Sequence, residues 1–216
     1  MKKNEQFVIT INRELGSGGR TVGEKLAEKL GVFFYDKALI QAICKEYNLT
    51  VDEVESLKGT KSNWWEDFQR HVVPFYKTAH TQYYRTKEGE EPTLITSASV
   101  YKTEKRVLQE IAGKGSCVIT GRLGFHVFKD HPNHLSILIQ APMEKRIARV
   151  MRKDGVSEEE AKEIIKKVDK MRDNYVQRFA DTTRYDTRNY DLVINMQNLT
   201  EDAAADLIKE YIDKAE

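Results

Sequence analysis

The chain has 216 residues, with 35 Lys or Arg against 34 Asp or Glu and a formal net charge of +1. Hydrophobic residues make up 40% of it and aromatic residues 9%, enough to fill a core, which excludes a wholly disordered chain. The balanced charge differs from the basic excess typical of proteins that bind nucleic acids or membrane surfaces, so we expect neither as a partner.

Particular residue types exclude further classes. Only Cys44 and Cys117 occur, so neither a disulfide framework nor a cysteine-rich zinc site can be built. His131 and His134 lie close in sequence, but we interpret their segment as a polar turn before a strand rather than a metal site. The first ten residues contain no apolar signal core, and no window approaches the roughly 18 apolar residues of a membrane span. We therefore expect a soluble, cytoplasmic protein.

Five segments are predicted to form strands. They are Gln6–Ile11, Val32–Tyr35, Ser116–Thr120, Leu135–Gln140 and Leu192–Asn195. All but the first are nearly continuous apolar runs, as is typical of strands buried on both faces of a parallel sheet. Helical patterns lie between and after them. The predicted helices cover Thr21–Leu30, a segment around Val100–Ile111, Pro142–Lys153, Glu158–Arg178 after a Ser157/Glu160 capping pattern, and a segment capped by Thr200. This alternation predicts one α/β domain over residues 1–216, with a parallel sheet covered by helices.

The region from Asp36 to about Thr96 interrupts this alternation. It contains no convincing strand but many aromatic residues, and Thr50 with Glu53 forms a capping pair, so a helical insertion is predicted over about residues 37–96. Its aromatic residues either pin the insertion to the body of the domain or line a pocket that stacks on a planar ligand.

A glycine-rich turn, NRELGSGGRT, separates the first predicted strand from the first predicted helix. Its glycines let successive N–H groups point inward, and the turn leads to a helix N-terminus, whose dipole favours an anion. We expect a phosphate there, although a tight turn without a ligand is the alternative. The residues predicted to bind it are Arg13, Gly16, Ser17, Gly18, Gly19, Arg20 and Thr21, of which Thr21 could also reach a magnesium ion. The lysine of a standard G-x-x-x-x-G-K-[ST] loop is absent.

The run INRELGSGGRTVGEKLAEKLGVFFYDKALI resembles the start of bacterial cytidylate kinases and, more closely, of the cytidylate kinase-like proteins. Cys117–Asp130, Leu135–Arg152 and Tyr190–Ile208 extend the resemblance to the middle and the end of the chain. It implies a P-loop nucleoside monophosphate kinase fold with a five-stranded parallel core. It also implies that the insertion holds the acceptor and that a lid-like helical region lies over about residues 150–185. The implied reaction moves the γ-phosphoryl group of ATP to CMP or dCMP with Mg²⁺.

The resemblance also implies roles for single residues. Gly19 occupies the position of the missing lysine, and Arg20 or Arg13 is the candidate to replace its charge. Asp36 matches an acidic residue that would orient a magnesium-bound water or the acceptor, although it could instead cap the following helix. These assignments place Arg20 and Asp36 in the catalytic site.

Acceptor and lid residues follow in the same way. Arg122 would bind the acceptor phosphate, unless it forms a surface salt bridge, and Asp130 could contact the acceptor base. Arg149 and Arg178 lie nearest the lid arginines that reach the transferring phosphoryl group, and a solvated helix face is the alternative for each.

Three departures from the family pattern bear on the function. The loop lysine is absent, Leu123 replaces the acid of a Gly-Arg-Asp turn, and the acceptor region is rich in aromatic residues. The expected function is an ATP- and Mg²⁺-dependent phosphotransferase acting on a nucleoside monophosphate such as CMP or dCMP, or on a related small acceptor. A catalytically impaired nucleotide-binding regulatory protein and a kinase of a different small molecule are the alternatives.

Overall fold

The computed structural model describes residues 1–36, 83–85, 93–95, 97–121 and 123–215. The chain divides into two compact units. The first comprises residues 1–37 and 111–216, and the second comprises residues 38–110. Each unit is described by itself.

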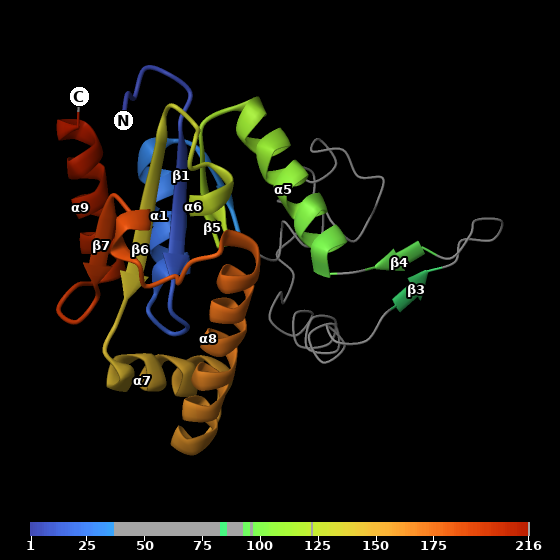
Figure 1. The fold of residues 1–216 in the computed structure, drawn as a ribbon. Coiled ribbons are helices and arrows are strands. Elements are labelled where there is room, and N and C mark those ends of the chain that lie inside the picture. The colour runs from blue at the N-terminus through green and yellow to red at the C-terminus, as the bar shows by residue number, and fades with distance from the viewer. Residues whose placement is uncertain (37–82, 86–92, 96, 122, 216) are drawn as a thin grey trace. The chain divides into compact units, whose positions relative to one another are not determined.

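The first unit contains a five-stranded sheet. Its elements in chain order are β1 (Val8–Arg13), α1 (Gly19–Leu30), β2 (Phe33–Tyr35), β5 (Cys117–Thr120), α6 (Gly124–Val127), β6 (His134–Gln140), α7 (Met143–Asp154), α8 (Glu158–Ala180), the 3₁₀ turn η2 (Thr187–Asn189), β7 (Leu192–Asn195) and α9 (Glu201–Lys214). The strand order is β2-β5-β1-β6-β7, and every pairing is parallel. The carboxyl ends of all five strands therefore share one edge, and α7 lies beyond the arrowheads of β1 and β6 (Figure 1).

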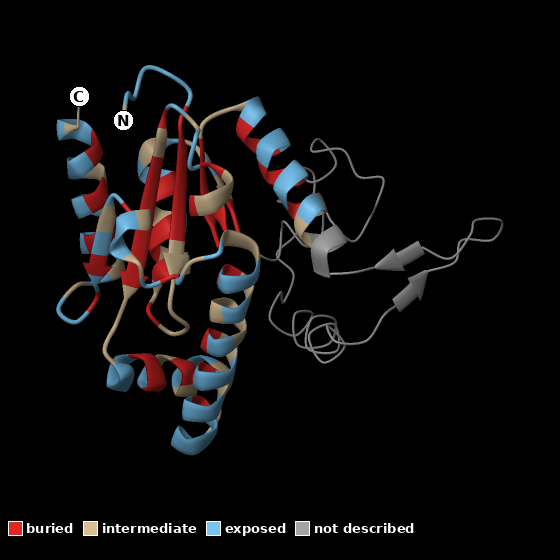
Figure 2. Ribbon diagram, viewed as in Figure 1, coloured by how far each residue is buried: buried red, intermediate tan, exposed pale blue. Residues whose placement is uncertain are grey.

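Successive side chains of a strand point to opposite faces of the sheet, and this alternation decides which strand residues pack against which helices. Ile9 and Ile11 of β1 belong to the main hydrophobic cluster, which also contains Leu26 of α1 and Ile208 of α9, so these two helices cover one face of the sheet. On the other face α6 packs on β1, because a Cβ added at Gly124 would lie 2.7 Å from Thr10 Cγ2. Figure 2 shows the central strands buried along most of their length.

Helix ends follow the predicted signals. The Ser157 and Glu160 pair forms the expected capping box, and Thr200 Oγ1 accepts a hydrogen bond from the Ala203 amide at 3.1 Å. The predicted bounds of β1 were wrong by two residues. Its ladder with β6 continues to Arg13, which pairs with Ile139, so Arg13 belongs to the strand and not to the loop.

In the second unit, β3 (Tyr83–Arg85) and β4 (Thr93–Ile95) pair antiparallel, and α5 (Ser97–Lys114) begins after them. The prediction that the insertion contains no strand was therefore wrong at these two segments. Each strand has only three residues, too few to show a period of two, and the pairing across the hairpin defines them. The predicted helical character of residues 37–82 and the Thr50/Glu53 pair lie outside the described residues.

None of the helices in the described ranges combines the length and the apolar composition that crossing a bilayer requires.

Candidate phosphate-binding site

The loop between β1 and α1 lies at the carboxyl edge of the sheet, where ligands bind in open α/β folds. Gly16 and Gly18 have φ angles of +80° and +88°, a conformation that other residues rarely adopt. A Cβ at Gly16 would also lie 2.7 Å from the Arg146 carbonyl oxygen. Both glycines are therefore required by the shape of the loop.

The amides after this turn are arranged for an anion. The Ser17 amide donates to the Glu14 carbonyl at 3.4 Å, and the Val22 amide makes the first helical bond, to the Gly18 carbonyl at 3.1 Å. The amides of Gly19 and Thr21, in the first turn of α1, have no carbonyl within the helix to bond. Together with the helix dipole, they form a partial positive charge that favours phosphate.

Buried charges from α7 and α8 hold the first half of the loop. Arg146, whose side chain is 5% exposed, donates from Nε to the Leu15 carbonyl at 2.8 Å and lies 3.3 Å from Glu14 Oε1. Asp169 accepts from the Leu15 amide at 3.1 Å and forms an ion pair with Arg146. Glu14 Oε2 accepts from the Ala141 amide at 3.0 Å. The peptide groups on both sides of Leu15 are thus fixed by charged partners.

A second buried guanidinium completes this network. Arg184, with no exposed surface, lies 3.2 Å from Asp169 and donates to the Arg13 carbonyl at 3.3 Å. Arg172 donates to the same carbonyl at 3.0 Å. Burial raises the pKa of Tyr185 to about 12, which keeps its hydroxyl protonated beside Arg184 at 2.7 Å. The sequence gives no signal for the two contacts to the Arg13 carbonyl, because each joins residues more than a hundred positions apart.

Arg20, expected to bind phosphate, is engaged along α1 and β2. Its Nε donates to Asp36 Oδ2 at 2.7 Å, and its NH1 lies 3.1 Å from Glu24 Oε2. The guanidinium also lies 5.7 Å from the centre of the Phe34 ring. Asp36 is 6% exposed, so Arg20 balances a buried carboxylate at the end of β2. The structure brings these two predicted site residues together.

Arg13 occupies the space beside the position of the missing lysine. A Cβ added at Gly19 would lie 2.7 Å from Arg13 Cβ, and one added at Gly121 would contact the Arg13 guanidinium. The Arg13 side chain therefore runs from the start of α1 to the end of β5. A lysine at position 19 would fit only if Arg13 moved.

Arg149 reaches the loop from α7. Its NH2 atom lies 3.1 Å from a Cβ added at Gly18, and it forms an ion pair with Glu201. Burial lowers the pKa of the Arg149 guanidinium, and the neighbouring charge of Arg152 lowers it further. The Arg149 guanidinium thus lies against the glycine turn, with Glu201 as its ionic partner.

The other predicted residues lie elsewhere. Arg178 is exposed on α8, with its guanidinium 5.5 Å from the centre of the Phe179 ring. Asp130 is exposed in the turn before β6, close to Asn133, whose carbonyl accepts from the Val8 amide at the start of β1. Asp130 thus lies at the amino edge of the sheet, opposite the loop. Arg122 lies outside the described residues.

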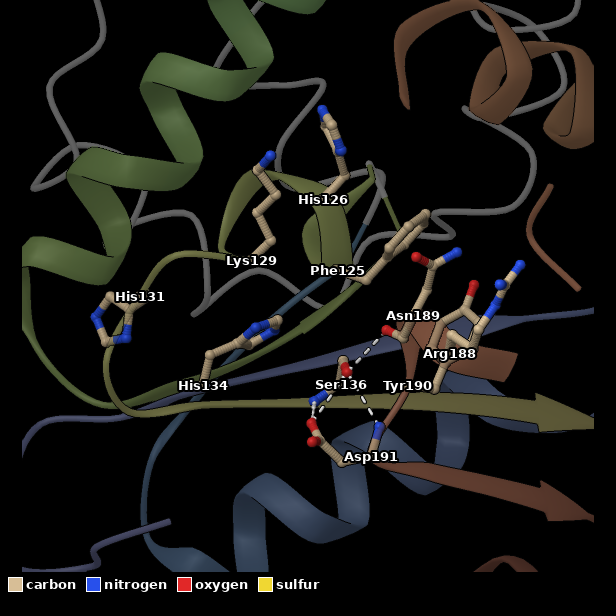
Figure 3. Close-up of a pocket in the computed structure, with 10 residues that line it drawn as sticks. All are labelled: Phe125, His126, Lys129, His131, His134, Ser136, Arg188, Asn189, Tyr190 and Asp191. Carbon is tan, nitrogen blue, oxygen red and sulfur yellow. Dashed lines mark hydrogen bonds between the residues drawn. The ribbon is translucent and has the colours of Figure 1, made fainter. Parts of the chain in front are cut away.

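A separate pocket of about 300 Å³ lies between α6, β6 and η2 (Figure 3). Ser136 Oγ donates to the Asn189 carbonyl at 3.0 Å, and the Ser136 amide donates to Asp191 Oδ2 at 2.7 Å. His134 Nε2 lies 2.7 Å from Thr10 Oγ1, and burial lowers the pKa of His134 to about 4. These polar groups bond to one another and join the strand to its neighbours. In the described part of the chain, no group of three or more His, Cys, Asp or Glu residues could hold a metal.

The sheet order and a glycine loop between its central strand and the first helix define a P-loop NTPase fold. Residues 8–198 match the model of the cytidylate kinase-like family, and the chain belongs to this family.

Curated relatives agree with this assignment. The chain is 26% identical to a cytidylate kinase of Pyrococcus horikoshii over 97% of its own length and 90% of the relative. It is also 27% identical to an S-adenosylmethionine-dependent nucleotide dehydratase of Lacinutrix mariniflava over 96% of its own length, but spans only 36% of that protein. The family and its kinase relatives support a nucleotide kinase-like function.

Solved structures show the same fold. An uncharacterized protein from Eubacterium ventriosum is 26% identical, with a TM-score of 0.70 over 97% of this chain and 100% of that one. A shikimate kinase from Bacteroides thetaiotaomicron, 14% identical, has a TM-score of 0.51 over 97% of this chain and 99% of that one. At that identity the second likeness concerns the fold alone.

Proposed function

We propose that this chain transfers the γ-phosphoryl group of ATP to a nucleoside monophosphate such as CMP or dCMP, or to a related small acceptor. The observation that carries the proposal is the loop of residues 16–21. Two glycines with positive φ, the first-turn amides of α1 and the Arg149 guanidinium meet there, in a chain of the cytidylate kinase-like family. The relative from Pyrococcus horikoshii is named a cytidylate kinase, which supports this choice of acceptor.

Phosphoryl transfer needs mainly positioning and charge neutralisation from the protein. The first-turn amides of α1 would bind the donor phosphates through their N–H groups. Arg149, held at Gly18, would face the same phosphates and stabilise negative charge on the transferring group. The fixed peptide groups around Leu15 keep the loop in one shape, so little reorganisation accompanies binding.

Oxygen donors near the loop fit a magnesium ion that is bound chiefly by phosphates. Thr21 lies in the first turn of α1 and Asp36 follows the end of β2. Thr120 ends β5, and its buried Oγ1 has no hydrogen-bond partner among the described groups. The β2–β5 register pairs Tyr35 with Ile119, so Asp36 and Thr120 follow side by side. We assign these three residues to the metal, which would neutralise phosphate charge when bound.

A nucleotide-binding protein with impaired catalysis is the second candidate. The observation in its favour is the packing of Arg13 against Gly19, which leaves no room for a loop lysine. In that case the loop binds ATP or ADP, and no acceptor is phosphorylated.

The deciding experiment is an ADP-release assay with ATP, Mg²⁺ and a panel of nucleoside monophosphates and other small acceptors. We expect turnover with CMP or dCMP above the ATPase background. Arg149→Gln should lower kcat/KM by about ten- to a thousandfold, since it removes a charged contact to phosphate. Arg152→Gln, an exposed arginine on the same helix, is the matched control.

Thermal unfolding separates the two candidates. Ligands that bind only the native state raise the apparent stability by mass action. Stabilisation by ATP and by CMP, together with turnover, supports the kinase. Stabilisation by ATP without turnover on any acceptor supports the impaired protein, and no stabilisation by any nucleotide contradicts both.

A further inference from the structure

A carboxylate from α9 lies at the glycine turn, beside the guanidinium of Arg149. A Cβ added at Gly18 would lie 3.1 Å from Arg149 NH2 and also 3.1 Å from Glu201 Oε1. The same two atoms form the ion pair that joins α7 to α9. A positive and a negative charge therefore meet directly against Gly18, immediately before the Gly19 amide at the start of α1.

The start of α1 gives an electrostatic reason for a negative charge at this place. Gly18 is the N-cap residue of α1 and has no side chain, and the first turn of the helix contains no acidic residue. A helix N-terminus favours a negative charge, and so does the neighbouring guanidinium of Arg149. Glu201 supplies that charge from within the chain, at the position where an anion bound to the loop would be favoured.

The backbone of Glu201 is fixed beside α1, whereas its side chain has room to move. Thr200 caps the first turn of α9, and Asp202 Oδ2 lies 2.7 Å from Lys25 Nζ of α1. The side chains of Arg149 and Glu201 are 30% and 24% exposed. The ion pair can therefore open by rotation of one side chain, while the packing of α9 stays as it is.

A phosphate group at the loop competes with Glu201 for Arg149, because the NH2 atom that faces Gly18 is the atom that the carboxylate holds. Guanidinium binds carboxylate and phosphate through the same N–H donors. A phosphate group can carry two negative charges and can also accept hydrogen bonds from the α1 amides, so it binds there more strongly than one carboxylate. Its binding free energy is reduced by the ion pair that it replaces.

We propose that Glu201 is an internal competitor of the donor nucleotide. Its carboxylate holds Arg149 at Gly18 before the nucleotide arrives, yields the guanidinium to phosphate on binding, and takes it back when ADP leaves. Glu201 thereby lowers the affinity of the loop for phosphate and speeds the release of ADP. This regulation rests on the proposed function, because it takes the phosphates of a nucleotide as the ligand of the loop.

Calorimetric titration with ADP and with inorganic tripolyphosphate, at about 0.15 M salt, measures the affinity without an acceptor. We expect Glu201→Gln to tighten both ligands about three- to thirtyfold and to slow ADP dissociation, since phosphate no longer displaces a carboxylate. Asp202→Asn is the matched control, because it removes the same charge from the same helix turn, but from a residue paired with Lys25. It should change the affinities by about twofold or less.

A double-mutant cycle separates competition for Arg149 from simple repulsion of the ligand by Glu201. In an Arg149→Gln background, the gain from Glu201→Gln should shrink to about twofold or less. An equal or larger gain in that background would overturn the proposal, as would an equal gain in Asp202→Asn. Unchanged or weaker binding by Glu201→Gln would overturn it too, and weaker binding would mean that Glu201 positions Arg149 for the ligand.

Thermal unfolding checks that each variant is folded, and Glu201→Ala repeats the titrations with a smaller side chain. The readout does not depend on catalysis. If no acceptor is phosphorylated but Glu201→Gln still tightens ADP through Arg149, the kinase assignment fails and the role of Glu201 stands. If neither the wild type nor Glu201→Gln binds ADP or tripolyphosphate, both fail.

Discussion

Acidification should destabilise the protein through His134, which starts β6 beside Thr10 of β1. The ring atom Nε2 lies 2.7 Å from Thr10 Oγ1, within hydrogen-bonding distance. Burial lowers the pKa of His134 from 6.5 to about 4, opposed by the nearby Asp191 carboxylate. The folded state therefore resists a proton that the unfolded chain accepts below pH 6.5. The contribution of neutral His134 to the free energy of unfolding is therefore complete above pH 6.5 and is lost as the pH falls toward 4.

The size of the effect follows from the two pKa values. The linkage relation gives a loss of about 2 kcal/mol in the free energy of unfolding between pH 7 and pH 5, and about 3 kcal/mol by pH 4. Urea unfolding of wild type and His134→Gln at several pH values measures it, since carboxylates contribute equally to both proteins. The wild type should lose more stability than the variant over this range by about the stated amount. Parallel pH profiles of the two proteins would refute the reasoning.

Three further changes test other parts of the structure. Gly19→Lys should lower the free energy of unfolding by about 1–3 kcal/mol, measured in urea, because the new Cβ would meet the Arg13 side chain. The same variant should not gain kinase activity. A variant that is more active and equally stable would contradict this. Asp169→Ala should cost about 3–5 kcal/mol, because it leaves the fully buried Arg184 with less counter-charge, and a fall in Tm no larger than that of an exposed Asp→Ala change would argue against it. Thr200→Ala should cost about 1 kcal/mol and Thr200→Ser almost nothing, as measured by thermal unfolding, because only the serine keeps the capping hydroxyl.

The sequence predicts the sheet well because its strands are short apolar runs bounded by glycine, proline or helix caps. The last strand, Leu192–Asn195, has the predicted bounds, and the helix after it starts at the expected threonine cap. The first strand ends later than predicted because its neighbour β6 is long enough to pair with Asn12 and Arg13. That extension depends on a partner strand, which no local pattern reveals.

The site could be predicted only where local geometry determines it. The glycines of the turn stand out in the sequence because the backbone needs positive φ angles at Gly16 and Gly18, while their binding of phosphate stays a prediction. The roles of Arg20 and Arg149 stay predictions. Their ion pairs with Asp36 and Glu201 join different elements of the fold, so no local sequence pattern reveals them. Asp169 gave no signal at all, since an acid in a charged helix usually faces solvent.

The pairing of β1 has a consequence for how the chain acquires its structure. Val8 pairs with Cys117 on one side and with His134 on the other, so both strands that pair with the central strand are made more than a hundred residues later. During synthesis its apolar run must wait for both, and the chain entropy of closing such long loops slows their meeting. We expect refolding from denaturant to be slow and prone to aggregation at high protein concentration. The apolar N-terminal strand is the segment through which the unfolded chains would associate.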